Sequence, residues 1–136
     1  MGNKKQLEKI IAKLQSTDYI DVTIERPIGF LQKKDWDPVQ PSYWDPYPFN
    51  YGFIDIMNPA DKENFDAIVL NFLKLEIGQK IKGKIVGMML RDDLDYKLIV
   101  IKDGTQVSAH DLSIIYDFYS PWFSGVKIEI WENQII

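Results

Sequence analysis

One stretch of the chain, residues 47–66, most constrains its fold, because it joins a rigid aromatic turn to clustered acids at the start of a strand. Asp61, Glu63 and Asp66 lead directly into AIVLNF, an apolar and β-branched run that predicts a buried strand. Carboxylates crowded at the mouth of a strand repel one another, so cations are expected to neutralise them. Hard divalent cations such as Mg²⁺ take oxygen ligands and commonly serve phosphate chemistry. The stretch therefore predicts a metal–phosphate site.

Short runs of alternating apolar and polar residues predict a mainly β protein around this stretch. The expected strands are residues 19–27, YPFNYGFI, DAIVLNFLKL, QKIKGKIVGMML, YKLIVI and GVKIEIW. Helical spacing predicts a helix over residues 3–16, with Leu7, Ile10, Ile11 and Leu14 on one stripe, and a second over 108–118, with Leu112, Ile115 and Tyr116 inward. The fold class is α+β: a compact closed sheet with helices packed outside. Residues 28–45 are expected to form a long ordered loop.

Size and composition favour a single domain over residues 1–136, with the helix of residues 1–16 appended to it. The net charge of −4 argues against a basic nucleic-acid-binding face. The absence of cysteine excludes thiolate metal sites, and one histidine, His110, cannot form a histidine-rich zinc site. No segment reaches the apolar length of a membrane span, and the lysine-rich start lacks a signal-peptide core. We therefore expect a cytoplasmic protein without membrane or nucleic-acid partners.

The parity of the first acidic cluster bears on how its carboxylates converge. Asp61 and Glu63 lie two residues apart, so an extended backbone would point both to one face. Asp66 has the opposite parity and needs a turn or a bulge to join them. The alternative is that these acids are solvated loop residues, as most are.

A second acidic turn, RDDLD, contains Asp92, Asp93 and Asp95 and precedes the YKLIVI strand. Asp95 shares a strand face with Lys97. A carboxylate beside an ammonium on one face suits a site that holds a metal ion and a phosphate oxygen together. Solvated loop acids are the alternative for this turn as well.

Four motifs, taken in order, resemble the soluble magnesium-dependent inorganic pyrophosphatases: VTIERP, YPFNYGFI, a D-x-E-x-x-D run entering a strand, and VGMM followed by DYKLIVI. The resemblance covers roughly residues 18–120. It implies a small closed β-barrel of the inorganic pyrophosphatase type, OB-like, with flanking helices. It also implies two or more Mg²⁺ ions, a homo-oligomer, and pyrophosphate or another small phosphorylated substrate.

The resemblance assigns roles residue by residue. The implied metal ligands are Asp61, Glu63, Asp66, Asp95 and one or both of Asp92 and Asp93. The implied catalytic residues are Asp66, which would orient the attacking water, together with Tyr51, Lys97 and Glu25. The implied phosphate contacts are Lys34, Lys97, Tyr51 and Tyr119. Glu63 replaces the central aspartate of the family's metal segment, and the shorter second turn leaves the choice between Asp92 and Asp93 open.

The family's phosphate-binding cations are the main departure. Val39 stands near the place of the phosphate-binding arginine, Ser120 replaces a lysine, and Trp36 replaces a glutamate. The residues that we consider as substitutes are Lys33, Lys34, Arg26 and Arg91. Weakened pyrophosphate hydrolysis is expected, because each lost charge-assisted hydrogen bond costs about 1.5–3 kcal/mol. The alternatives are a non-catalytic metal- or phosphate-binding relative and a hydrolase of a different phosphorylated substrate.

Overall fold

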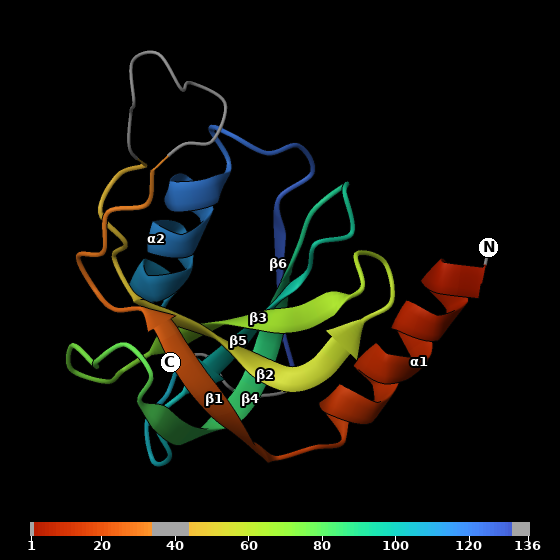
Figure 1. Cartoon of the computed structure of the whole chain (residues 1–136), viewed down its shortest axis with the longest axis horizontal. Coiled ribbons are helices and arrows are strands. Elements are labelled where there is room, and N and C mark those ends of the chain that lie inside the picture. Colours follow the sequence, from red (N-terminus) through yellow and green to blue (C-terminus); the bar gives the residue numbers. More distant parts are fainter. Residues whose placement is uncertain (1, 34–43, 132–136) are drawn as a thin grey trace.

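The computed structural model describes residues 2–33 and 44–131 of the chain, and in that part it contains two helices and six strands (Figure 1). The helices are α1 (Gly2–Gln15) and α2 (Ala109–Tyr119). The strands are β1 (Tyr19–Arg26), β2 (Asn50–Asn58), β3 (Glu63–Leu70), β4 (Lys80–Leu90), β5 (Lys97–Ile101) and β6 (Lys127–Ile130). Within these ranges, none of the helices has the length and apolar character needed to cross a bilayer.

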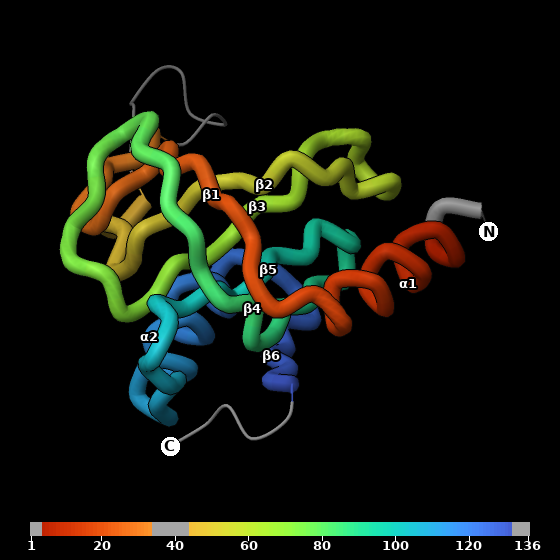
Figure 2. The backbone as a smooth tube through the Cα atoms, turned by 90° about the horizontal axis from the view of Figure 1, so that it is seen from below, coloured from red at the N-terminus to blue at the C-terminus, as the bar shows by residue number. Residues whose placement is uncertain are grey.

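The sheet closes on itself into a barrel. Its strand order is β1-β2-β3-β5-β4, and β4 also pairs with β1, so the five strands form a ring; β6 adds to β4 outside this closure. Only β3 and β5 run parallel, whereas every other pair is antiparallel. Figure 2 shows β1 and β4 running side by side, where this ring closes. The predicted mainly β fold with a closed barrel is confirmed.

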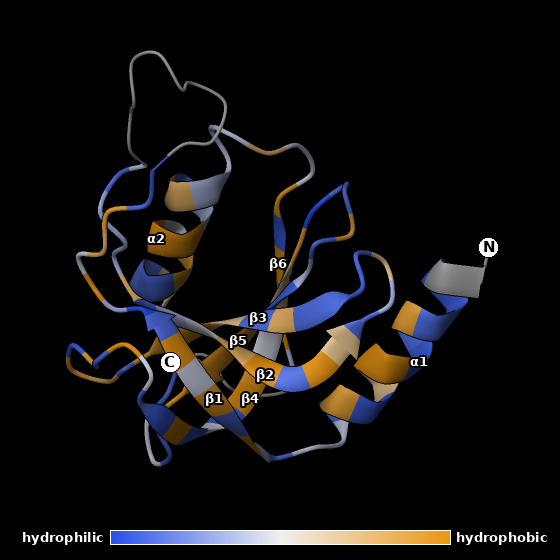
Figure 3. Cartoon of the chain, in the orientation of Figure 1, coloured by the Kyte–Doolittle hydropathy of each residue, from blue (hydrophilic) through white to orange (hydrophobic). Residues whose placement is uncertain are grey.

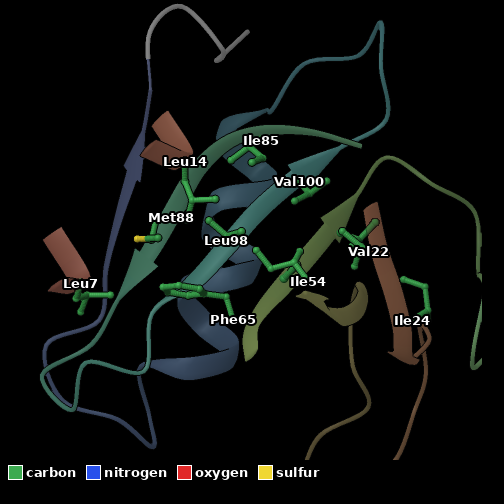
Figure 4. Close-up of a cluster of buried hydrophobic side chains, with 12 residues drawn as sticks. Leu7, Leu14, Val22, Ile24, Ile54, Phe65, Ile85, Met88, Leu98 and Val100 are labelled. Carbon is green, nitrogen blue, oxygen red and sulfur yellow. The ribbon is translucent and has the colours of Figure 1, made fainter. Parts of the chain in front are cut away.

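Two hydrophobic clusters lie on the two faces of the barrel wall. The first gathers side chains from all five barrel strands and from α1, among them Phe65 on β3 and Leu98 on β5 (Figure 4). The second lies under α2 and includes Ile68 on β3 and Ile99 on β5. Because side chains alternate along a strand, a residue that is two positions before Ile68 or Ile99 points to the α2 side. This alternation decides on which side the polar site lies.

The two helices pack on opposite sides of the barrel (Figures 1 and 2). The predicted stripe of α1 faces the barrel, with Leu7 and Leu14 buried in the first cluster, and Figure 3 shows hydrophobic and polar residues alternating along this helix. Burial of this apolar stripe holds the helix in place, since an isolated helix of this length is marginal in water.

Helix α2 begins with a capping box. The Ser108 side chain accepts a hydrogen bond from the Asp111 amide, and the Asp111 side chain accepts one from the Ser108 amide. Ile115 is buried as predicted. Tyr116, which was predicted to point inward, is 45% exposed, because the buried stripe runs from Ile115 to Tyr119 and Tyr116 lies at its edge.

Candidate active site

A pocket of about 330 Å³ opens on the α2 side of the barrel, where the polar ends of several strands meet the end of α2. Its charged lining residues are Arg26, Lys33, Asp66, Arg91, Asp95 and Lys97. Its aromatic walls are Trp44, Tyr47, Tyr51, Phe118, Tyr119 and Phe123. Four basic side chains against two carboxylates give this pocket a positive balance, although the chain as a whole is acidic. Such a pocket favours an anionic ligand.

Lys97 is the centre of the polar network. The parallel register of β3 and β5 sets Asp66 directly beside Lys97. The Lys97 ammonium donates to the Tyr51 hydroxyl over 2.6 Å and to Asp66 Oδ2 over 3.0 Å, and lies 3.5 Å from Asp95 Oδ2. Its side chain is only 5% exposed. Because a buried ammonium needs partners, these contacts hold both carboxylates at the pocket.

Two tyrosines complete the wall beside Lys97. Burial raises the pKa of Tyr51 well above its ordinary value, with the neighbouring Tyr119 and Asp66 adding to the effect. Burial likewise raises the pKa of Tyr119, so both phenols stay protonated at neutral pH. The Tyr119 hydroxyl is buried and has no hydrogen-bond partner among the described residues. It is therefore a donor that a ligand in the pocket can use.

The end of β1 contributes Glu25 and Arg26. Arg26 Nη1 donates to the Tyr47 hydroxyl over 2.7 Å, and its guanidinium carbon lies 5.0 Å from the centre of the Tyr51 ring. Glu25 is half-buried, and burial raises its pKa, with the negative charge of Asp66 adding to the shift. Glu25 thus lies within electrostatic reach of Asp66 and is easier to protonate than an ordinary glutamate.

The second acidic turn, residues 91–95, folds around Arg91. Arg91 Nε donates to Asp93 Oδ1 over 3.0 Å, Nη2 contacts Asp93 Oδ2, and Nη2 also lies 3.2 Å from Asp95 Oδ2. The guanidinium carbon sits 3.6 Å from the centre of the Phe123 ring. The hydrogen bond from Arg91 lowers the pKa of Asp93. This turn is therefore ordered by its own cation.

Asp92 has a different environment from Asp93. The Asp92 amide donates to the Ser124 carbonyl over 3.1 Å, and a Cβ on Gly125 would lie 2.0 Å from Asp92 Oδ1. Asp92 therefore packs against the segment that follows α2, whereas Asp93 and Asp95 gather on Arg91. Neither Asp92 nor Asp93 lines the pocket. The choice between Asp92 and Asp93 as a turn ligand stays a prediction.

The turn between β2 and β3 carries the first acidic pair. Asp61 and Glu63 are both exposed, and Asp61 Oδ1 accepts a hydrogen bond from the Glu63 amide over 2.9 Å. Neither residue lines the pocket, and neither forms an ion pair within the described part of the chain. Glu63 nevertheless contributes to the raised pKa of Glu25, so its charge reaches the edge of the site.

The donor chemistry of the pocket suits Mg²⁺. Among residues 2–33 and 44–131, no three or more histidine, cysteine, aspartate or glutamate residues form a group that could hold a metal ion. Asp66 and Asp95 nevertheless present two carboxylates beside one ammonium. Mg²⁺ commonly binds through one or two carboxylates, several waters and substrate phosphate oxygens. These two residues fit that pattern, and the larger ligand set stays a prediction.

Apart from Lys97, the basic residues that line the pocket are not those that the family pattern supplies. Lys34, Trp36 and Val39 lie outside the described residues. Ser120 is the C-terminal cap of α2. Three of the four substitutes considered from the sequence, Arg26, Lys33 and Arg91, line the pocket. Trp44 and Phe123 also line it, although no chemical motif in the sequence distinguishes them from other aromatic residues. Tyr47, the first residue of YPFNYGFI, lines it as well.

Comparison with known proteins places these features in a family. The model of the family described as "Inorganic pyrophosphatase" matches residues 36–131. Among curated proteins, the inorganic pyrophosphatase of Helicobacter pylori strain 26695 is 29% identical over 108 aligned residues, covering 65% of this chain and 62% of that protein. The protein of strain J99 is 28% identical with the same coverage. The chain thus spans 62% of the length of these curated relatives.

Solved structures support the fold. An inorganic pyrophosphatase from Ehrlichia chaffeensis superimposes with a TM-score of 0.62 at 20% identity, covering 84% of this chain and 86% of that one. The Helicobacter pylori inorganic pyrophosphatase superimposes with a TM-score of 0.60 at 24% identity, covering 83% and 82%. At these identities the likeness establishes a shared fold.

Proposed function

The chain belongs to the inorganic pyrophosphatase family, and from that premise we propose that it hydrolyses pyrophosphate to phosphate with the help of Mg²⁺. The observation that carries the proposal is the position of Lys97, which joins Asp66, Asp95 and Tyr51 at one wall of a positively charged pocket. Carboxylates and an ammonium held together in this way serve a metal ion and a phosphate oxygen side by side.

Substrate binding falls to the basic residues of the pocket. The pocket, which has room for a diphosphate, is lined by the positive charges of Arg26, Arg91 and Lys97. Each charge-assisted hydrogen bond to phosphate contributes about 1.5–3 kcal/mol. The unpaired hydroxyl of Tyr119 adds a neutral donor. In this proposal Arg26 and Arg91 offset the charge missing at Val39 and Ser120, so weakened hydrolysis remains an expectation for kinetics to measure.

Asp66 and Asp95 would hold Mg²⁺, with Asp61, Glu63 and Asp93 or Asp92 as further ligands for a second ion, and the metal would lower the pKa of bound water and neutralise phosphate charge. Asp66 would orient the attacking water, because Lys97 fixes its carboxylate at the pocket wall. Glu25 lies within electrostatic reach of Asp66, and burial raises its pKa, which makes it a better proton acceptor than an ordinary glutamate.

The decisive experiment is phosphate release from pyrophosphate at saturating Mg²⁺, comparing the wild type with Asp66→Asn. We expect the substitution to lower kcat by about 100-fold or more, since it removes a charge that would hold the metal and orient the water. Asp55→Asn, an exposed aspartate of β2, is the matched control and should retain wild-type activity. Wild-type release no faster than that of Asp66→Asn would refute hydrolysis of this substrate and leave a non-catalytic phosphate-binding relative.

Family membership also supports a homo-oligomer in the cytoplasm as part of the proposal. Sedimentation of the purified full chain would test the oligomeric state. A single species with the mass of one chain across a wide concentration range would contradict it.

A further inference from the structure

Arg91 occupies the centre of the turn that the family pattern assigns to metal binding. It contacts both oxygens of Asp93, Oδ1 through Nε at 3.0 Å and Oδ2 through Nη2. Its Nη2 also lies 3.2 Å from Asp95 Oδ2. That same Asp95 oxygen lies 3.5 Å from the Lys97 ammonium. Both carboxylates are therefore neutralised by cations that belong to the chain.

The surroundings of Arg91 hold its charge in place. Its side chain is 6% exposed, and its guanidinium packs on the Phe123 ring at 3.6 Å. Arginine keeps its proton at any physiological pH. A divalent cation on Asp95 would therefore lie next to a fixed positive charge, and the repulsion between the two would weaken metal binding. Movement of the guanidinium away from Asp95 would relieve this repulsion.

We propose that Arg91 is a built-in counter-ion that competes with the divalent metal for Asp95 and Asp93, and that metal binding releases its guanidinium to anionic substrate in the same pocket. Arg91 lines that pocket, so the released side chain needs only a local change to meet a phosphate. The inference rests on the proposed function for the identity of metal and substrate. It adds a residue that the family's metal and phosphate pattern does not supply.

Competition of this kind has a thermodynamic signature. If phosphate draws Arg91 away from the turn, inorganic phosphate must strengthen Mg²⁺ binding, and Mg²⁺ must strengthen phosphate binding by the same factor. Part of this coupling comes from direct contact between metal and phosphate, which no arginine substitution removes. The part that depends on Arg91 is the difference between the wild type and a variant without the guanidinium.

The test is calorimetric titration of the full chain with Mg²⁺ alone, comparing the wild type with Arg91→Gln. We expect the variant to bind Mg²⁺ about tenfold more tightly or better, because a charge-assisted contact no longer has to be broken. Lys33→Gln is the matched control: Lys33 lines the same pocket but makes no ion pair within residues 2–33 and 44–131. Its effect should stay within about twofold, as for exposed charges.

Two further measurements distinguish the expected result from misfolding of the Arg91→Gln variant. Arg91→Lys keeps the charge but loses the two-pronged contact with Asp93, and it should tighten Mg²⁺ binding by an intermediate factor. In the presence of inorganic phosphate, the wild type should gain more Mg²⁺ affinity than Arg91→Gln does.

Unchanged or weaker Mg²⁺ binding in folded Arg91→Gln and Arg91→Lys would overturn the inference, as would binding too weak to measure in all three proteins. These titrations involve no turnover, so their failure is distinct from a failure of pyrophosphate hydrolysis. An active wild-type enzyme whose variants bind Mg²⁺ unchanged would refute the role of Arg91 alone.

Discussion

Two acidic turns carry the predicted metal ligands, and the fold stabilises them in opposite ways. In the β2–β3 turn, Asp61 and Glu63 are exposed and have no cation partner within the described part of the chain. In the turn of residues 91–95, Asp93 and Asp95 are held by Arg91, and Asp95 also by Lys97. Their sequences are similarly acidic, so the difference arises from which basic residues the fold brings to each turn.

In one half of the site the chain supplies its own cations to the carboxylates, whereas in the other half the described residues supply none. Asn58 connects the two halves: its side-chain amide donates to the Leu94 carbonyl over 3.1 Å, while its side-chain oxygen accepts from the Ala60 amide over 2.9 Å. Asn58 is buried, so these bonds are shielded from water. The spacing between the turns is thus defined even though their charges are balanced differently.

The largest effect is expected from the loss of the Lys97 ammonium, which lies at the centre of the polar network. Lys97→Met keeps the volume of the side chain but removes the ammonium that contacts Asp66, Asp95 and Tyr51. We expect kcat/KM for pyrophosphate to fall by about 100-fold or more. The substitution removes an ammonium that we propose binds phosphate, and it leaves Asp66 without the contact that fixes its position. Lys80→Met, on an exposed position of β4, is the control. A folded Lys97→Met variant with near wild-type kinetics would contradict the central place of this residue.

A smaller effect is expected when one aspartate in each turn is substituted, which compares the two turns directly. Without metal, Asp95→Asn should lower the free energy of unfolding by about 1 kcal/mol, because it breaks contacts with Arg91 and Lys97 at a partly exposed site. Asp61→Asn should change it by less than about 0.5 kcal/mol, because no cation is lost. Urea unfolding in a chelator measures both. Added Mg²⁺ should then stabilise each variant less than the wild type. If both substitutions lowered the free energy of unfolding equally in chelator, the proposed difference between the turns would be wrong.

The smallest expected effect concerns Glu25, which forms no ion pair within the described part of the chain. Burial raises the pKa of the Glu25 carboxyl group, so between its ordinary pKa and its raised pKa the folded chain holds a proton that the unfolded chain releases. The free energy of unfolding therefore falls as the pH rises through this range. Glu25→Gln should therefore raise the melting temperature at pH 8 and leave it nearly unchanged at pH 4, where the carboxyl group is mostly protonated in both states. The gain in the free energy of unfolding at pH 8 should be below about 1 kcal/mol. A difference between the two proteins that does not vary with pH would show that the ionisation of Glu25 is not responsible.

The sequence predicts the strands well, because alternation reports local burial directly. Residues 19–27 and 127–130 illustrate this: their apolar positions share one face both in the pattern and in the structure. The cap of α2 was also present as S-x-x-D at Ser108, and this signal would have located the start of the helix. Tyr116 was misplaced because a short helix has apolar residues on more than one side, and packing alone selects the buried stripe.

The site is only partly readable from the sequence. Lys97 and Asp95 share a motif, but the neighbour of Lys97 on β3 depends on a parallel register that no local pattern specifies. The position of Arg91 depends on how its turn curls back onto Asp93 and onto Phe123, 32 residues further along the chain. A list of substitute cations could include Arg91, but only the fold reveals that it pairs with the acids themselves.

The parallel pairing of β3 with β5 also bears on how the protein reaches its folded state. Asp66 and Lys97 are 31 residues apart, and Tyr51 and Lys97 are 46 apart, so none of these contacts can form within a hairpin. Parallel pairings of this kind arise late, after the chain has closed long loops at an entropic cost. A partly folded chain can therefore contain most of its strands and still lack the site. Assembly of the contacts around Lys97, rather than strand content, is the measure of complete folding for this barrel.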